Sequence, residues 1–521
     1  MNSVIKIVLI MNKILREQDR MQKIKQAIEK KNIHAQVFII HWLDPDFLLK
    51  ILEISPNVVL TFPLTAKSLS YRLYILKFAL NFLLVTFRTE GILLNTNSKT
   101  LVKMFEGKDD YGVTLIDHEI FWGAKTSNII GKNLLEQNKI SSLDRVHYFG
   151  TPLFESYLGR NQSDNELPLY VKTILDEYSR KNILLIVTGF HYAEYSSDDI
   201  LRAGDLVDSN SKTFTKDFNN WLIFINKCKF FRQMWIDAII YSARKNPHLL
   251  FVVKMHPAEI DLYKRKEVDP YSVFNKHKNV LLIIDPISFC NIIPYCSILF
   301  HYGSTTMLEA YISKVPSVYV DSKQIKTIKS LFNPFEEPEI PSNFTIDIYD
   351  FPGFVLQYKS SSIHFQRIDK IDAFLKEQVD LILDEPYRPS DRIANFLLSI
   401  ANEKAQTIVS NDKHLLSIIH GKYFKHNIIP TLCERGFAMI ESGKFLEALK
   451  KYLDPVLRLS TIGQYKISKL QYARSFALSK LGLVDQAIIA IKEELTFFPN
   501  NKQAQDLNCK LHATSSNGII K

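Results

Sequence analysis

The chain has 521 residues, is poor in cysteine and glycine, and lacks long uninterrupted apolar runs. Its 5 cysteines form no CxxC pair, and so sparse and odd a set favours a reducing compartment over a disulfide-bonded secreted protein. With 17 glycines and no low-complexity segment, the chain is not collagen-like. These absences indicate an ordinary folded protein, whose length suggests about two to four domains.

The most apolar stretch, Tyr71 to Phe87, is interrupted by Arg72 and Lys77 and is slightly short for a membrane span. We therefore expect a buried helix that runs into a strand, with a surface resting on an inner membrane as the alternative. Lys6 lies inside the N-terminal apolar run and no small-residue cleavage site follows, so we expect no signal peptide. The expected location is cytoplasmic, with peripheral association at the inner membrane left open.

Positive charge is in modest excess, since 65 Lys and Arg residues stand against 55 Asp and Glu residues, a net charge of +10. The chain has no zinc-finger spacing, no RNA-recognition aromatic signature and no dense basic arm, so nucleic acid is not an expected partner. A phosphate-bearing ligand or an anionic membrane surface fits this charge at least as well.

Strand and helix patterns alternate over roughly the first hundred residues, which is typical of a parallel sheet covered on both faces. The expected elements are strands at Val4 to Ile10, Ala35 to Ile40, Asn57 to Phe62 and Leu83 to Phe87, and a helix over Arg16 to Lys31. A second series follows the turn-like Phe149-Gly150-Thr151-Pro152. Its strands are expected at Asn182 to Val187, Leu249 to Lys254, Val280 to Ile284, Ser297 to Phe300 and Ser317 to Val320, and its helices at Phe231 to Lys245 and Ser288 to Tyr295.

Two consecutive α/β series of similar size predict two Rossmann-like domains facing a cleft. The first is expected over residues 1–152 and the second over residues 153–385. Helices are also expected at Ile368 to Leu383 and Arg392 to Gln406, and residues 386–425 are interpreted as a helical linker that returns to the body.

The pattern becomes all-helical over residues 426–521. Gly443 precedes Ala448 by five residues, Gly482 precedes Ala487 by the same interval, and the two glycines lie 39 residues apart. This arrangement resembles the tetratricopeptide repeat, a helix pair whose small residues allow close packing. Two units are few for an independent solenoid, so we expect them to dock on the body of the protein or on a partner protein.

Polar residues follow three successive strands of the second series. Lys254, His256 and Pro257 come at the end of one strand, Asp285 follows the next, and the decapeptide HYGSTTMLEA begins directly after Phe300. Because ligands of open parallel sheets bind at the carboxyl ends of the strands, these residues are expected to line one crevice.

The decapeptide has the composition of a phosphate-binding loop that leads into a helix. Gly303 allows a tight turn, and Ser304, Thr305 and Thr306 are able to cap the helix and donate hydrogen bonds to an anion. Glu309 lies about one turn inside the helix, where its carboxylate can accept from ribose hydroxyls. The alternative is that the hydroxyl residues only cap a helix and Glu309 is a solvated acid.

The segment K-M-H-P, followed by G-S-T-T-M-L-E-A-Y-I-S-K-V-P, resembles the nucleotide-binding half of GT-B glycosyltransferases. More narrowly it resembles the bacterial surface carbohydrate biosynthesis proteins (polysaccharide, capsule and lipopolysaccharide) with an HP motif and a Ser/Thr motif. The resemblance implies that His256, Pro257 and the Ser/Thr loop bind the nucleotide, with Lys254 neutralising phosphate and Glu309 at the position of the glutamate in UDP-sugar enzymes. It also implies metal-independent chemistry without a cofactor, in which the nucleotide-sugar is a substrate.

The stretch Phe149 to Glu155 is similar to the interdomain segment V-T-G-N-P-R-F-D of the same superfamily, but it lacks the Asn and the Arg. Gly189 and His191, after the first strand of the second series, are candidates to approach the donor phosphates, with a simple loop as the alternative. Asp109 and Asp110 are adjacent, but they have no third ligand nearby, so no metal site is expected.

The first domain is expected to supply a base that takes the proton of the acceptor hydroxyl. The carboxylate and histidine candidates follow expected strand ends at Phe87 and Ile116, and they are Glu90, Asp117, His118 and Glu119. The alternative for each is a surface or capping residue.

These features predict a glycosyltransferase that moves a sugar from a CMP- or UDP-linked donor to a surface polysaccharide or lipopolysaccharide acceptor, either a glycan or a lipid-linked glycan. A nucleotide-sugar 2-epimerase or hydrolase of the same fold is the first alternative. The second is a non-catalytic scaffold in which the C-terminal repeats bind a protein partner.

Overall fold

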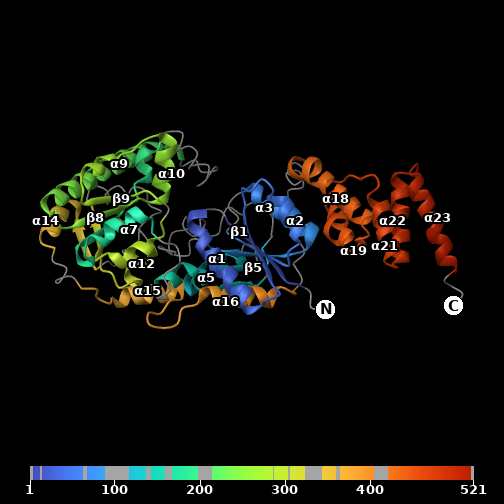
Figure 1. Ribbon diagram of the computed structural model, residues 1–521, viewed down its shortest axis with the longest axis horizontal. Coiled ribbons are helices and arrows are strands. Elements are labelled where there is room, and N and C mark those ends of the chain that lie inside the picture. Colours follow the sequence, from blue (N-terminus) through green and yellow to red (C-terminus); the bar gives the residue numbers. More distant parts are fainter. Residues whose placement is uncertain are drawn as a thin grey trace.

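The structure is a computed structural model, and it describes residues 4–11, 14–62, 67–88, 116–136, 142–158, 167–196, 214–285, 287–302, 306–322, 343–358, 364–403 and 420–517. Two α/β units, each built on a parallel sheet, lie side by side, and a helical region extends from the first unit (Figure 1). The predicted fold class, two Rossmann-like α/β domains followed by an all-α region, is confirmed.

The first sheet is six-stranded and parallel, with the order β2-β1-β3-β4-β5-β6. Its strands run over β1 (Lys6–Met11), β2 (Gln36–His41), β3 (Val58–Thr61), β4 (Leu83–Phe87), β5 (His118–Phe121) and β6 (Val146–Tyr148). Ile7 pairs with Val37 on one side and with Val58 on the other. Apolar residues fill both faces of these strands, as expected for a parallel sheet covered by helices on both sides.

Alternate residues of β1 divide the first domain into two cores. Ile7 and Leu9 face α1 (Ile14–Lys31), whereas Val8 and Ile10 face α2 (Phe47–Ile54) and α3 (Lys67–Leu80). The apolar stretch Tyr71 to Phe87 is therefore a buried helix followed by strand β4, as predicted. Another helix, α5 (Ala124–Glu136), follows β5.

The second sheet is also six-stranded and parallel, with the order β12-β11-β10-β7-β8-β9. Its strands run over β7 (Ile183–Val187), β8 (Leu250–Lys254), β9 (Val280–Ile283), β10 (Ile298–His301), β11 (Ser317–Asp321) and β12 (Phe344–Asp347). The short strands β6 and β12 are additions to the strands expected from the sequence, and β5 begins at His118, two residues after the strand end expected at Ile116.

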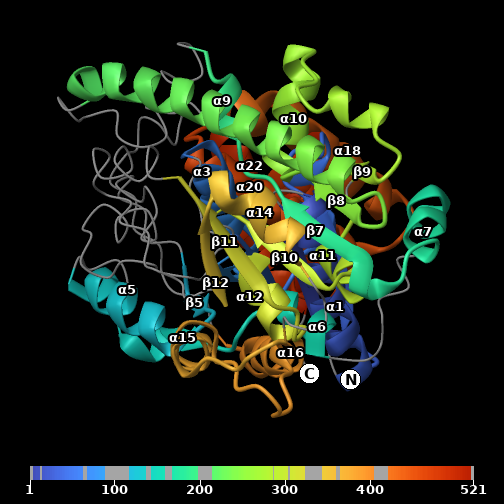
Figure 2. The same cartoon turned by 90° about the vertical axis from the view of Figure 1, so that its left-hand side faces the viewer.

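Helices cover both faces of the second sheet. One core contains residues of α9 (Phe214–Lys245), α10 (Pro257–Lys266) and α14 (Phe351–Leu356). The other contains residues of α7 (Leu169–Asp176), α11 (Phe289–Ile292) and α12 (Thr306–Ile312). Figure 2 shows α9 lying across the top of this domain; the helix begins at Phe214, well before the predicted start at Phe231.

The chain returns to the first domain earlier than the expected boundary at residue 385. Helix α15 (Asp369–Val379) packs on α5, and α16 (Pro389–Ile400) packs on α1. Ile371, Leu375, Ile393 and Leu397 share one core with α1 and with residues of α12. The crossover therefore begins at α15, and it forms part of the contact between the two domains.

The C-terminal helices pack on the face of the first domain that α2 and α3 cover. They run over a π-helical segment (Gly421–Ile428), α18 (Ile429–Glu441), α19 (Phe445–Ala448), a second π-helical segment (Leu449–Leu453), α20 (Asp454–Ile462), α21 (Leu470–Lys480), α22 (Val484–Phe497) and α23 (Lys502–Asn517). Arg458 Nη1 donates to the Ala79 carbonyl at 2.8 Å. These helices thus dock on the body of the protein, which was one of the two expected outcomes.

Gly443 and Gly482 occupy equivalent places, two residues after the last residue of α18 and of α21, each with φ +77°. Glycine adopts this left-handed conformation at the least cost because it has no Cβ, which explains the glycines that the sequence repeats. No helix among the described residues is both long enough and apolar enough to cross a membrane.

Candidate functional site

The carboxyl ends of neighbouring strands in the second sheet bring several of the predicted residues to one edge. Strands β10, β7 and β8 are adjacent and parallel, and they lead into Tyr302, Thr188 and His256. Lys254 is the last residue of β8, and Pro257 is the first residue of α10. Lys254, His256 and Pro257 thus lie at the carboxyl end of β8, beside the carboxyl end of β7.

Glu259, which the sequence reasoning did not single out, connects two of these strand ends. Its Oε2 accepts from the Thr188 hydroxyl and, at 3.2 Å, from the His256 backbone N–H. Its Oε1 accepts from the Tyr271 hydroxyl at 2.9 Å and from the Tyr263 hydroxyl at 3.2 Å. The side chain is 0% exposed, and this burial raises the pKa of Glu259 although the hydrogen bonds oppose the shift.

The bond from His256 N–H to Glu259 is half of a capping box. Pro257 and Glu259 stand at the first and third positions of α10, and an acid at the third position reaches back to the N–H of the residue before the helix. The sequence signal was present, because Pro257 followed two residues later by Glu259 is typical of a helix start. Glu259 therefore positions the backbone of the His-Pro loop.

Glu309 meets a tyrosine that comes from the segment between the two domains. The hydroxyl of Tyr157, in α6 (Glu155–Leu158), donates to Glu309 Oε2. Burial and the nearby Glu309 carboxylate raise the pKa of Tyr157, so the phenol is a neutral donor. Glu309 is 7% exposed, which contradicts the alternative of a solvated acid.

Lys254, the last residue of β8, is a cation that interacts electrostatically with Glu309. Burial lowers the pKa of Lys254, and the Glu309 carboxylate opposes the shift. The Lys254 ammonium at the end of strand β8 can neutralise one phosphate oxygen while the buried Glu309 carboxylate of α12 accepts from a hydroxyl group.

The structure describes fewer contacts for the other predicted binding residues. Asp285 follows β9 and accepts a hydrogen bond from Tyr170 on α7, and Thr306 is the first residue of α12. A Cβ added to Gly189 would meet no heavy atom within 4 Å, so there is open space in front of it. His191 begins a short 3₁₀ turn, and nothing is described of its side chain. Gly303, Ser304 and Thr305 lie outside the described residues.

The expected positions of the first-domain base candidates need correction. Asp117 directly precedes β5, and His118 and Glu119 lie inside it, so none of them follows the carboxyl end of a described strand. Lys77 Nζ donates to Asp117 Oδ2 at 2.5 Å, with both side chains buried. The Leu84 N–H donates to the same oxygen at 2.7 Å. Asp117 is thus the buried partner of a cation on α3.

Glu119 and His118 also contact polar side chains of their own domain. Arg88, which follows β4, forms a buried ion pair with Glu119. His118 lies with Nδ1 3.2 Å from His147 Nε2, and its pKa is lowered, chiefly by burial. Glu119 is accommodated inside β5 because Arg88 is its buried partner. Glu90, the remaining candidate, lies outside the described residues.

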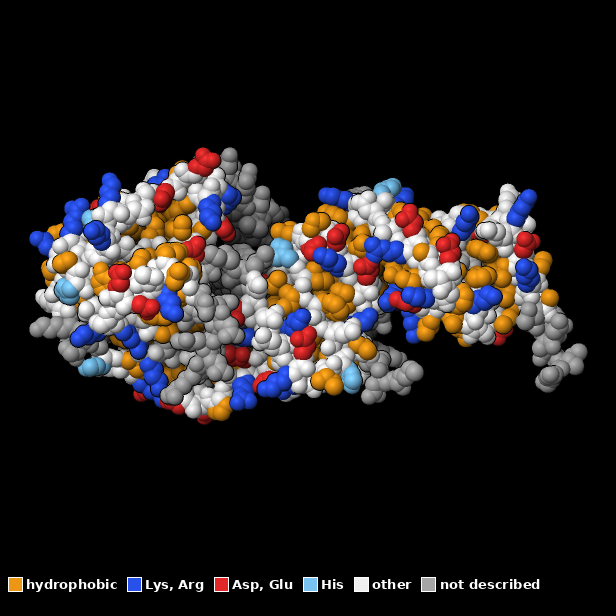
Figure 3. Space-filling view, viewed as in Figure 1, with side chains coloured by type: hydrophobic (Ala, Val, Ile, Leu, Met, Phe, Trp, Pro, Cys, Tyr) orange, Lys and Arg blue, Asp and Glu red, His pale blue; other side chains and the backbone are white. Residues whose placement is uncertain are grey.

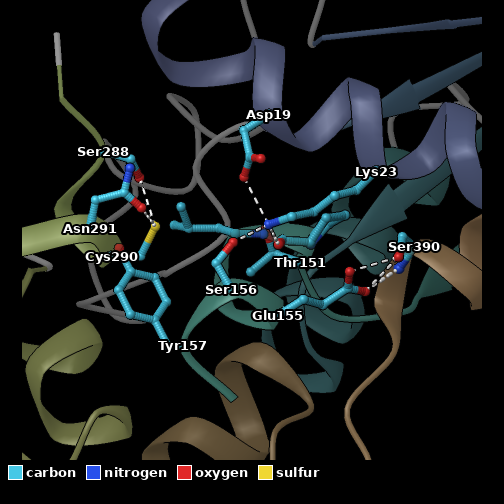
Figure 4. Close-up of polar contacts among 12 residues, drawn as sticks. Asp19, Lys23, Thr151, Glu155, Ser156, Tyr157, Ser288, Cys290, Asn291 and Ser390 are labelled. Carbon is cyan, nitrogen blue, oxygen red and sulfur yellow. Dashed lines mark hydrogen bonds and ion pairs between the residues drawn. The ribbon is translucent and has the colours of Figure 1, made fainter. Parts of the chain in front are cut away.

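The interdomain segment is held to the first domain by polar contacts on both sides (Figure 4). Glu155 Oε1 accepts from the Ser390 N–H at 2.6 Å and from the Ser390 hydroxyl at 2.7 Å. Lys23 of α1 donates to Ser156 and, at 3.2 Å, to the Pro152 carbonyl. Tyr157 continues this segment to Glu309, so the segment connects the first domain to the nucleotide-site candidate.

Within the described ranges, no group of three or more His, Cys, Asp or Glu side chains is arranged to hold a metal ion. The polar groups described at the carboxyl edge of the second sheet include the Lys254 ammonium, the buried carboxylates of Glu259 and Glu309, and the His256 N–H that Glu259 caps. These groups suit a ligand that carries both hydroxyl and phosphate groups.

No protein-family model matches the chain, and no curated protein sequence matches it. Among solved structures, the chain is similar to UDP-GlcNAc 2-epimerase from Methanocaldococcus jannaschii in complex with UDP-GlcNAc and UDP, with 12% identity and TM-score 0.42 over 76% of this chain and 100% of that one. It is also similar to the wall teichoic acid polymerase TagF, with 12% identity and TM-score 0.46 over 77% of this chain and 90% of that one. Likeness at this level does not identify an activity or a substrate.

Proposed function

We propose that the protein is a metal-independent glycosyltransferase that takes a sugar from a pyrimidine nucleotide-sugar, linked to CMP or UDP. The acceptor is a surface polysaccharide or lipopolysaccharide chain, and the reaction takes place on the cytoplasmic side of the membrane. The observation that carries this proposal is the buried Glu309 carboxylate at the carboxyl edge of the second sheet, with the half-buried Lys254 close enough to interact with its charge. The capped His256-Pro257 loop at the same edge supports it.

In this proposal Glu309 accepts a hydrogen bond from a ribose hydroxyl, and Lys254 neutralises charge on the leaving phosphate. The bond between the anomeric carbon and the phosphate oxygen breaks as the acceptor oxygen bonds to that carbon, and the acceptor proton passes to a base. Asp117 and Glu119 are held in buried ion pairs, which disfavours them as the base. Glu90 stays the sequence-based candidate for that role.

The proposal is tested first by thermal stability with CMP, CDP, UDP and GDP. A pyrimidine nucleotide at one hundred times its dissociation constant stabilises the fold by about 2.7 kcal/mol. We expect Glu309→Gln to weaken binding roughly five- to tenfold, because it replaces a hydrogen bond to a charged acceptor, which contributes about 1.5–3 kcal/mol, by one to a neutral acceptor, which contributes about 0.5–1.5 kcal/mol. Glu385→Gln, at an exposed position, is the matched control and should bind as the parent does.

Each alternative function has a distinct outcome. Turnover of the nucleotide-sugar without an acceptor indicates an epimerase or hydrolase. No stabilisation by any nucleotide indicates a scaffold whose C-terminal helices bind a partner protein. If Glu309→Gln and His256→Ala both bind nucleotide with the affinity of the parent, the assignment of the nucleotide site is wrong, although the description of the fold still holds.

A further inference from the structure

The edge of the second sheet opposite the proposed nucleotide site is strongly basic. The amino ends of β7, β8 and β9 are preceded by a 3₁₀ turn (Arg180–Asn182), by the last turn of α9 and by a second 3₁₀ turn (Ser272–Lys276). Six exposed cations lie in or next to these segments, and we call them the basic edge: Arg180, Lys181, Arg244, Lys245, Lys276 and Lys278. In the space-filling view, Lys and Arg side chains gather at the left-hand end, where the second domain lies (Figure 3).

Hydrogen bonds hold the segments of the basic edge together. Asn279 Nδ2 donates to the carbonyls of Ala243, Asn246 and Leu249 at 3.0, 3.2 and 3.1 Å, which joins the start of β9 to the end of α9. Strands β7, β8 and β9 are neighbours in the sheet, and neighbouring strands lie about 4.8 Å apart. The cations therefore form one surface that the fold keeps in place.

Few carboxylates balance this charge. Residues 176–182, 241–249 and 275–279 contain the six cations and only two acidic residues, Asp176 and Glu177, both exposed. The whole chain has 65 basic against 55 acidic residues, so positive charge is concentrated at this edge well beyond the average. Arg244 and Lys276 both lower the pKa of His277, after the larger effect of burial, which is consistent with their converging on one place.

An exposed aromatic side chain accompanies the cations. Tyr241 is 49% exposed on the outer face of α9, and Lys245 Nζ lies 5.9 Å from the centre of its ring. Tyrosine with lysine and arginine is the combination that favours the interface between a bilayer and water. A site for an acidic polysaccharide would need the cations but not the exposed aromatic ring.

We propose that the basic edge docks the protein on an anionic lipid surface. The contact is peripheral: cations approach the headgroups and Tyr241 reaches the boundary between headgroups and acyl chains. Because a parallel sheet has its amino ends opposite its carboxyl ends, docking at this edge leaves the proposed nucleotide site uncovered. A strand of four or five residues separates the two edges by about 15 Å.

The test is co-sedimentation of the full chain with phosphatidylcholine vesicles that contain about one third phosphatidylglycerol. We expect binding to these vesicles, loss of binding in pure phosphatidylcholine, and a steep decrease as salt increases. Each basic residue near an anionic surface contributes roughly a factor of five to binding. The variant R244Q/K245Q/K276Q/K278Q should therefore lower the partition coefficient by about several hundredfold.

The matched control is K444Q/K450Q/K492Q/K502Q, which removes four exposed lysines from the C-terminal helices and should bind as the parent does. Far-UV circular dichroism and the nucleotide-dependent thermal shift check that both variants are folded. Equal binding to neutral vesicles, or equal loss in both variants, would overturn the proposal. So would absence of vesicle binding together with tight binding of dextran sulfate or RNA, which would assign the basic edge to a soluble polyanion.

Discussion

Replacing Glu259 tests whether one buried carboxylate organises the loops at the proposed nucleotide site. In Glu259→Gln the remaining carbonyl oxygen can still accept from His256 N–H and Thr188. The new amide group then faces Tyr263 and Tyr271, whose hydroxyls can rotate to accept. The substitution therefore keeps the same partners in contact, reverses the direction of the two hydrogen bonds to tyrosine, and removes the charge.

The expected change in the free energy of unfolding follows from the type of each hydrogen bond. A hydrogen bond to a charged acceptor contributes about 1.5–3 kcal/mol and a neutral one about 0.5–1.5 kcal/mol. Since the neutral amide also avoids the burial of a charge, we expect Glu259→Gln to lower the free energy of unfolding by only about 1–2 kcal/mol. Glu259→Ala removes the acceptor from four buried or partly buried donors, and we expect a loss of more than about 3 kcal/mol.

The loss of unfolding free energy caused by Glu259→Gln should become smaller as pH rises. The folded-state pKa of Glu259 is raised above its ordinary value, so in the pH range between the two values the folded state binds more protons than the unfolded state. The parent therefore loses stability as pH rises through this range, with a slope of at most about 1.36 kcal/mol per pH unit. Glutamine does not titrate, so the difference between parent and variant should shrink as pH rises.

Urea denaturation at several pH values, followed by circular dichroism and tryptophan fluorescence, measures these differences. Trp235 is buried in the core of the second domain, so its emission reports on the domain that holds Glu259. Glu385→Gln serves as the exposed control. The reasoning is wrong if Glu259→Ala unfolds at the same urea concentration as that control, or if the deficit of Glu259→Gln grows as pH rises.

Two further substitutions separate structural roles from catalytic ones. Asp117→Asn should lower the free energy of unfolding by about 3–5 kcal/mol, because it leaves Lys77 buried without its carboxylate, and adding Lys77→Met should restore part of that stability. A large loss of activity without loss of stability would instead assign Asp117 as the base. Tyr157→Phe should lower the melting temperature because it removes the hydroxyl that joins the interdomain segment to Glu309. Tyr349→Phe, at a 67% exposed side chain, is the control and should have no effect. Equal melting temperatures of the two variants would show that the hydrogen bond from Tyr157 to Glu309 contributes nothing to stability.

Much of the fold was predictable because periodicity reports burial. The continuous apolar runs of β1, β7 and β8 belong to strands buried on both faces, and their observed bounds lie within two residues of the predicted ones. The strands that the sequence did not reveal are short: β6 is Val-His-Tyr and β12 is Phe-Thr-Ile-Asp. Four residues with two polar side chains give too little alternation to distinguish a strand from a loop.

The positions of Asp117 and Glu119 show where pattern reasoning ends. Charged residues after an apolar run usually lie in a loop, and that generalisation placed them at a strand end. Their actual burial depends on Lys77 and Arg88, which are 40 and 31 residues away in the sequence. Likewise the contact between Tyr157 and Glu309 joins residues 152 apart, and only the packing of the two domains brings them together. By contrast, the local capping pattern at Glu259 was visible in the sequence.

The polarity of the second sheet connects the two proposals. In a parallel sheet all strands point the same way, so the loops after the strands and the loops before them form separate surfaces. The loops after β7 and β8 contain Thr188 and His256, fixed by Glu259, whereas the segments before β7, β8 and β9 contain the basic edge. The contact from Tyr157 to Glu309 shows that the carboxyl edge faces the first domain, so the basic edge faces away from it. A change at the basic edge should therefore alter membrane binding without altering nucleotide affinity, and Glu309→Gln should do the reverse.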